Sequence, residues 1–74
     1  MPFDEATTVF DDPLSVTRRD PLHSDEEDRF ITIGRSHLNR ILVVVHMDRG
    51  DNIRIISARP GTGREKKQYA KSET

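Results

Sequence analysis

The chain has 74 residues and a mass of 8.5 kDa, which leaves room for a single domain over residues 1–74. Apolar residues make up 32% of the chain and charged residues 34%, and the net charge at pH 7 is −1. No apolar run approaches the roughly 20 residues that cross a bilayer, and no signal peptide is apparent. The lack of cysteine excludes disulfides and thiolate sites, so a cytoplasmic protein is expected.

The charges are unevenly distributed along the chain. Residues 1–29 contain nine acidic residues and three arginines, whereas residues 30–74 contain nine basic residues and four acidic ones. Halves of opposite sign are typical of two faces with different partners, or of ends that neutralise each other. The basic half suits the phosphate backbone of a nucleic acid.

The N-terminal segment is predicted to be a short amphipathic helix over residues 3–10. Its apolar residues recur at helical spacing, at Phe3, Ala6, Val9 and Phe10. The helix should end before Pro13, because the residue that precedes a proline avoids the helical region. Alternating apolar and polar residues over 14–18 then predict a half-buried strand, and the polar residues 20–28 a loop.

Three more strands are expected in the middle of the chain. The β-rich run of residues 29–35 is the first, and a short turn over residues 36–39 follows it. Residues 41–47 are the most apolar segment and should form the central strand, filled on both faces. A hairpin signal at residues 48–51, in which Gly50 is free to take a positive φ, leads to a paired strand over residues 53–59.

A C-terminal helix completes the expected fold. It should cover residues 64–72, after the Pro60–Gly63 break, and it has almost no apolar face. The whole order indicates an α+β domain with a four-stranded antiparallel meander sheet flanked by a short N-terminal and a C-terminal helix. A domain of this size buries only about 60% of its unfolded surface, and these helices cover little of the sheet. We therefore expect self-association through exposed sheet, a bound partner or a missing piece of the fold.

The last strand and the helix after it carry a group of cations. Strict alternation would place Arg54, Ile56 and Ala58 on one face of the sheet, and Ile55, Ser57 and Arg59 on the other. Cations follow the strand on the helix, at Arg64, Lys66 and Lys67. A helix N-terminus at this point adds backbone N–H groups, an arrangement suited to phosphate. A solvated, charge-rich helix end accounts for the same composition equally well.

Tyr69 and the three histidines are the other candidates for chemistry. Tyr69 is the only tyrosine and lies four residues after Glu65; its phenol can donate a proton or stack on a base, although such a tyrosine more often packs against the sheet. The histidines lack metal-ligand spacing, and His46 is expected in the core or at an edge. His23 beside the acidic residues 25–28 suggests either a metal site or, more commonly, a solvated loop.

Several short motifs are distributed over nearly the whole chain, from about Phe3 to Tyr69. They are Phe10-Asp-Asp-Pro13, Asp20-Pro-x-His23, Glu27-Asp-Arg29, Ile33-Gly34, Leu42-Val-Val-Val45, Arg49-Gly50-Asp51 and Arg54-Ile-Ile-Ser-Ala-Arg59, then Thr62, Arg64-Glu65 and Tyr69. Together they resemble the BrnT toxins of bacterial type II toxin–antitoxin systems. The strand that ends at Arg59, with the helix start after it, is the most specific part of this resemblance.

The resemblance implies a ribonuclease with a RelE-like fold that inhibits translation and is neutralised by a BrnA-like antitoxin. The implied reaction is attack of the RNA's own 2′-hydroxyl on the adjacent phosphate, without a metal ion or a cofactor. The resemblance implies no membrane partner. It assigns charge stabilisation to Arg59 and Arg64, and a role as base or arginine-orienting group to Glu65. Tyr69 would act as an acid or stack on a base. RNA binding would fall to Arg54, Lys66 and Lys67.

Two departures from the family pattern point to an alternative function. Family members usually begin with a further strand and a helix, whereas Met1 here stands close to the start of the second helix, so a shortened fold is expected. After the strand arginine, Pro60, Gly61 and Gly63 replace a basic residue, a small residue and an arginine. Both departures favour a shortened, weak or inactive homologue that acts mainly as an antitoxin-binding module.

Overall fold

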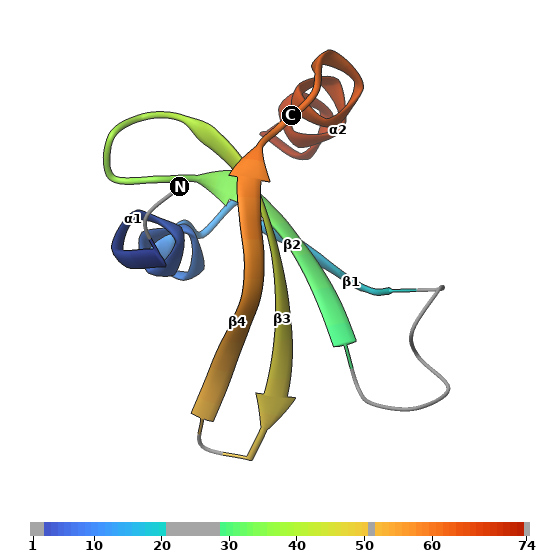
Figure 1. Cartoon of the computed structure of the whole chain (residues 1–74). Coiled ribbons are helices and arrows are strands. Elements are labelled where there is room, and N and C mark those ends of the chain that lie inside the picture. The colour runs from blue at the N-terminus through green and yellow to red at the C-terminus, as the bar shows by residue number, and fades with distance from the viewer. Residues whose placement is uncertain (1–2, 21–28, 51, 74) are drawn as a thin grey trace.

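The computed structural model describes residues 3–20, 29–50 and 52–73 (Figure 1). The elements in chain order are α1 (Phe3–Thr7), η1 (Thr8–Asp11), β1 (Val16–Arg19), β2 (Arg29–Arg35), β3 (Ile41–Arg49), β4 (Asn52–Pro60) and α2 (Gly63–Glu73). The strands form one open antiparallel sheet in the order β1-β2-β3-β4. The predicted α+β meander with a helix at each end is therefore confirmed. No helix in the described ranges is long and apolar enough to cross a membrane.

The N-terminal helix tightens before it ends. Its first turn is α-helical, and the 3₁₀ turn of η1 continues it to Asp11. The hydroxyls of Thr7 and Thr8 donate to the carbonyls of Asp4 and Glu5, at 2.8 and 2.6 Å, and such local bonds compete with the regular helical ladder. Asp12 is extended, as expected of a residue that precedes a proline.

The first strand begins later than the alternating pattern predicts, at Val16. Asp12 explains the delay, because its Oδ1 accepts the N–H of Leu14 at 3.0 Å and its carbonyl accepts the N–H of Ser15 at 3.1 Å. This aspartate turn occupies the residues that would otherwise open the strand. β1 then pairs from Val16 opposite Ile33 onwards.

The two described turns of the sheet use residues with positive φ. Asn39 has φ 64° in the β2–β3 turn, where the N–H of Ser36 donates to the carbonyl of Arg40 at 2.8 Å. Gly50 has φ 60° in the β3–β4 hairpin, as its position in the hairpin signal predicts. Both positions suit the residue present, because asparagine and glycine enter this region most easily.

The core has two small parts on opposite faces of the sheet. On one face α1 and η1 cover β3, in a cluster of Ala6, Val9, Leu42 and Val44. On the other face α2 places Tyr69 against Ile33 and Val43. β3 contributes to both clusters, which confirms the expectation that its two faces are filled. Both helices lie near one end of the sheet, and the β3–β4 hairpin extends away from them (Figure 1).

A bulge in β4 overturns the predicted distribution of its side chains. His46 pairs with Ile55 and Val45 pairs with Ser57, so Ile56 is an extra residue in the ladder. Ile55 and Ala58 consequently pack against the same cluster beneath α1. Strict alternation had placed them on opposite faces, and the bulge shifts the phase between them.

The same shift moves the strand's arginines. Arg54 pairs with Met47 and Arg59 pairs with Val43, and alternate residues of β3 share a face. Arg54, Ser57 and Arg59 therefore all lie on the α2 side of the sheet, whereas Arg54 was predicted on the opposite side from Arg59. The bulge therefore brings Arg54 and Arg59 onto one face of the sheet, whereas strict alternation would place them on opposite faces.

A buried carboxylate joins the N-terminal helix to the β2–β3 turn. Glu5 is 2% exposed, and it accepts hydrogen bonds from Ser36 Oγ at 2.7 Å and Arg40 Nε at 2.8 Å, with a further bond from Arg40 Nη2. The bonds from Arg40 and then Ser36 lower the pKa of the Glu5 carboxyl. Hydrogen bonds to Glu5 thus join α1 to the β2–β3 turn at the point where the small apolar cluster ends, and they satisfy the buried carboxylate.

Gly34 is expected to be intolerant of a side chain. An added Cβ would lie 2.7 Å from Val9 Cγ1 and 3.0 Å from Ser15 Cβ, whereas at Gly63 nothing lies within 4 Å. Gly34→Ala should lower the free energy of unfolding in urea by about 1–3 kcal/mol through overpacking. Gly63→Ala, the matched control in the first turn of α2, should leave it unchanged or raise it by up to about 1 kcal/mol. Equal stability of the two variants would contradict this packing.

Candidate functional site

The start of α2 is held by a reciprocal cap. The backbone N–H of Thr62 donates to Glu65 Oε1 at 2.8 Å, and the N–H of Glu65 donates to Thr62 Oγ1 at 3.3 Å. A threonine followed three residues later by a glutamate is the capping-box pattern. Gly61 anchors the preceding turn, because its N–H donates to the carbonyl of Ile41 at 2.9 Å. The cap therefore fixes the Glu65 carboxylate beside the end of β4.

Glu65 holds Arg59 in a two-pronged ion pair. Arg59 Nη1 and Nη2 each lie 2.8 Å from one carboxylate oxygen of Glu65. The Arg59 side chain is 54% exposed and that of Glu65 only 15%, so the guanidinium is oriented while the side chain as a whole stays accessible to solvent. A planar fork of this kind also matches a phosphate.

The electrostatics of the pair favour one of the two roles considered for Glu65. Hydrogen bonds from Arg59, together with the smaller contribution from Thr62, lower the pKa of Glu65 to about 2. The hydrogen bonds that Arg59 donates to Glu65 in turn raise the pKa of Arg59. A carboxylate that remains ionised to such low pH is a poor proton acceptor at neutral pH. The geometry thus suits Glu65 as the group that orients Arg59.

Tyr69 is buried and its hydroxyl already has a partner. The side chain is 3% exposed and packs with Ile33 and Val43. Its O–H donates to Asp12 Oδ2 at 2.5 Å, and the Arg35 guanidinium lies 5.5 Å from the ring centroid. Burial, and then the bond to Asp12, raise the pKa of Tyr69. This arrangement matches the expectation that a lone tyrosine packs against the sheet.

Asp12 is the common acceptor beneath this site. Besides the Tyr69 hydroxyl, its Oδ2 accepts the N–H of Arg35 at 2.9 Å, and its Oδ1 accepts the N–H of Leu14. Burial acts to raise the pKa of Asp12, but the hydrogen bonds from Tyr69, Arg35 and Leu14 outweigh it and keep the pKa lowered. Asp12 therefore links the end of η1, the end of β2 and the middle of α2.

The other cations singled out in the sequence do not take part in the ion pair. Arg54, Arg64, Lys66 and Lys67 are exposed, and none of them pairs with a carboxylate among the described residues. Lys66 lines an open hollow of about 390 Å³ together with Asn39 and Arg40. The structure thus joins Arg59 and Glu65 directly, and it leaves the other cations available to solvent.

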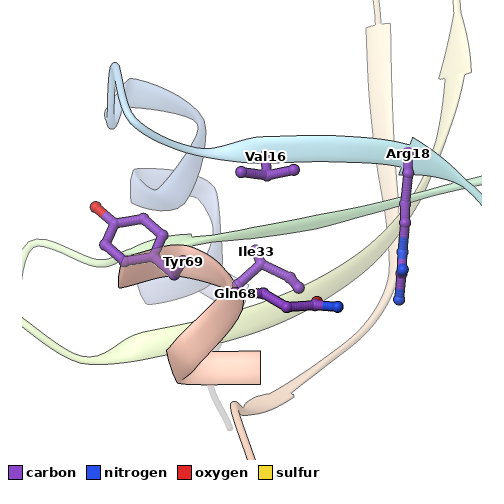
Figure 2. Close-up of a pocket in the computed structure, with 5 residues that line it drawn as sticks. All are labelled: Val16, Arg18, Ile33, Gln68 and Tyr69. Atoms are coloured by element: carbon purple, nitrogen blue, oxygen red, sulfur yellow. The ribbon is translucent and has the colours of Figure 1, made fainter. Parts of the chain in front are cut away.

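A small pocket that the sequence did not indicate lies between β1 and α2. It has a volume of about 150 Å³ and is lined by Val16, Arg18, Ile33, Gln68 and Tyr69 (Figure 2). The alternation in the predicted first strand places Val16 and Arg18 on one face, which is the only local signal for it. Nothing in the sequence indicates that this face would meet α2.

His46 lies in the core, as expected. It is 5% exposed, and its Nε2 lies 2.7 Å from Thr32 Oγ1. Phe10 meets the imidazole edge-on at 4.9 Å, and Phe30 stacks on it at 5.9 Å between centroids. His23 and the acidic residues 25–28 lie outside the described residues.

A comparison with protein families finds a match over most of the chain. The family model described as "Ribonuclease toxin, BrnT, of type II toxin-antitoxin system" matches residues 1–65. The matched segment contains the Arg59–Glu65 pair and ends before Tyr69. A search of curated proteins found no significant match.

The Arg59–Glu65 pair should give a characteristic acid dependence of stability. The pKa of Glu65 falls from an ordinary value of 4.5 to about 2 in the folded chain, so the stabilisation is complete above about pH 4.5 and is lost as the pH falls towards 2. The difference in unfolding free energy between the natural chain and Glu65→Gln should therefore be constant from about pH 5 to 7 and shrink below that range. Urea titrations at a series of pH values measure it. A difference that persists undiminished near pH 2 would contradict the ion pair.

Proposed function

Because the chain belongs to the BrnT family of ribonuclease toxins of type II toxin–antitoxin systems, we propose that it cleaves RNA without a metal ion and so inhibits translation in the cytoplasm. We further propose that an antitoxin of the BrnA type binds and neutralises it. The Arg59–Glu65 pair is the observation that supports this proposal most directly. It presents the oriented guanidinium of an exposed arginine on a sheet face that also carries Arg54.

In the proposed reaction the ribose 2′-oxygen attacks the adjacent phosphorus. A bond forms between them, the bond from phosphorus to the 5′-oxygen breaks, and a 2′,3′-cyclic phosphate remains. One proton leaves the 2′-hydroxyl and one reaches the 5′-oxygen. Glu65 is ionised and the Tyr69 hydroxyl is bonded to Asp12, so we assign both transfers to solvent water. The contribution of the chain is then to stabilise the negative charge that develops on the phosphate.

Each basic residue has a distinct place in this scheme. Arg59 would bind the phosphate at which cleavage occurs, with Glu65 as a positioning residue that fixes the guanidinium. Arg64, exposed in the first turn of α2, would supply the second positive charge. Arg54, Lys66 and Lys67 would bind neighbouring phosphates, a sequence-independent contribution that weakens as salt rises. Tyr69 would act as a positioning residue that keeps α2 on the sheet.

A second candidate function is that of an antitoxin-binding module with little activity of its own. It is favoured by apolar side chains that remain exposed around the sheet, such as Leu38 at 56% and Ile53 at 49%. The pairing of Arg59 with Glu65 also favours it, since a phosphate must share the guanidinium with a carboxylate. Exposed apolar surface and open strand edges are suited to a protein partner or to a second copy of the chain.

Cleavage of a structured RNA by the purified chain in excess EDTA is the test of the ribonuclease proposal. Arg59→Ala should reduce the rate about 100-fold or more, as expected for removal of a charge-stabilising donor. Arg19→Ala removes an arginine from the opposite face of the sheet, and this control should retain the rate. Undiminished cleavage by Arg59→Ala would overturn the proposed site. A folded natural chain that binds the antitoxin and leaves RNA intact would support the binding module instead.

Tyr69→Phe separates a positioning role from an acid role. The variant keeps the ring and loses only the hydroxyl that donates to Asp12, which should lower the unfolding free energy by about 1 kcal/mol. Cleavage by the folded variant should remain close to that of the natural chain. Retained folding by circular dichroism with cleavage lost would instead make Tyr69 the proton donor.

A further inference from the structure

The pocket between β1 and α2 has the composition of a site for one flat ring with a polar edge. Val16 and Ile33 supply aliphatic surface, and the Tyr69 ring supplies an aromatic wall. Figure 2 shows Gln68 extending along the pocket towards Arg18, so the polar groups gather at one end. From this arrangement we infer that the pocket binds a single guanine base of the RNA, an inference that rests on the proposed ribonuclease function.

The size of the pocket limits what can occupy it. Its volume is about 150 Å³, well below the range of about 300–1,000 Å³ that is typical of sites for larger ligands. One unstacked base of a single-stranded RNA is an occupant of suitable size and shape. Single-stranded RNA is commonly recognised in this way, by bases that leave the stack and meet aromatic or guanidinium groups.

The walls of the pocket are held in place from outside it. Tyr69 is fixed by its bond to Asp12 and by the Arg35 guanidinium above the ring. Ile33 lies in β2, which pairs on both sides, with β1 and with β3. A preformed cavity of this kind loses little conformational freedom when a base enters it.

Arg18 is the group that would select guanine. It lines the pocket, it is exposed, and no carboxylate among the described residues forms an ion pair with it. The fork of an arginine matches the O6 and N7 acceptors of guanine, whereas uracil offers no such pair of neighbouring acceptors. Gln68 carries both a donor and an acceptor beside it.

The position of the pocket suits a nucleic acid more than a protein side chain. Arg18 pairs with Ile31 and Val16 with Ile33 across the sheet, so both lie on the face that carries Arg54 and Arg59. A chain of phosphates crossing this face could meet Arg54 and Arg59 on β4 as well as Arg18 in the pocket. An apolar side chain of an antitoxin would find the apolar walls but would leave the Arg18 guanidinium without an acceptor.

Binding of uncleavable RNA tests the inference separately from catalysis. The probes are a short 2′-O-methyl oligouridine with one central guanosine and the same oligomer with uridine at that position, measured by fluorescence anisotropy. The methyl group blocks the attacking oxygen, so affinity is read without cleavage. The natural chain should bind the guanosine oligomer about tenfold more tightly, the effect of one good two-pronged contact.

Three variants assign this preference to the pocket. Arg18→Ala should abolish the preference, and Arg18→Lys should also lose most of it because the charge remains without the fork. Arg19→Ala, the neighbouring arginine on the opposite face, should retain the preference. Val16→Phe places a larger side chain in the cavity from the exposed strand β1. This variant should also lose the preference for guanosine, although no charge is removed.

The outcomes separate the pocket from the ribonuclease proposal. Equal affinity of the natural chain for the two oligomers, or a preference that survives Arg18→Ala, would overturn the guanine site even if RNA is cleaved. The same conclusion would follow if neither oligomer binds, and a protein side chain would then be the expected occupant of the pocket. A guanine preference that depends on Arg18, in a chain that does not cleave RNA, would support the pocket while the ribonuclease proposal fails.

Discussion

The position of α2 depends on the carboxylate of Asp12. This one side chain accepts hydrogen bonds from Leu14, Arg35 and Tyr69, and thereby joins three segments that are far apart in the chain. The helix itself is too polar to be held on the sheet by burial alone, since Tyr69 is its one buried side chain among those described. Apolar packing of Tyr69 and its hydrogen bond therefore act together. Without them the middle of α2, where Tyr69 lies, would lose its attachment to the sheet.

A second anchor operates at the other end of the same helix segment. The Glu65 carboxylate caps α2 and forms an ion pair with Arg59, so one group stabilises both the helix start and the candidate site. This double role has a cost in function. An arginine that is already paired must share its donors with a phosphate, although the Arg59 side chain remains exposed to solvent. The ion pair thus weakens phosphate binding by Arg59, but it also holds the guanidinium in one orientation.

The small size of the domain explains why polar contacts matter so much. Two clusters of a few apolar residues lie on opposite faces of the sheet, and each is completed by buried or half-buried carboxylates. Glu5 accepts hydrogen bonds that join α1 to the β2–β3 turn, and Asp12 accepts the hydrogen bond that joins α2 to the rest of the domain. Hydrogen bonds to charged groups are stronger than those between neutral groups, and in a short chain they supplement a limited hydrophobic core.

The elements and their order could be predicted from the sequence, because helix periodicity, strand composition and turn residues are local properties. Residues 29–35, the hairpin at Gly50 and the helix after Pro60 were all predictable in this way, and so was the strand–turn–helix unit that carries Arg59 and Glu65. Which side chains share a face, and which residues they contact, depends on how the strands and helices pair and pack. The bulge at Ile56 arises from pairing with β3, and it moved Arg54 to the face of Arg59. The bond from Tyr69 to Asp12 and the pocket between Arg18 and Gln68 join residues distant in the chain, so no local pattern could reveal them.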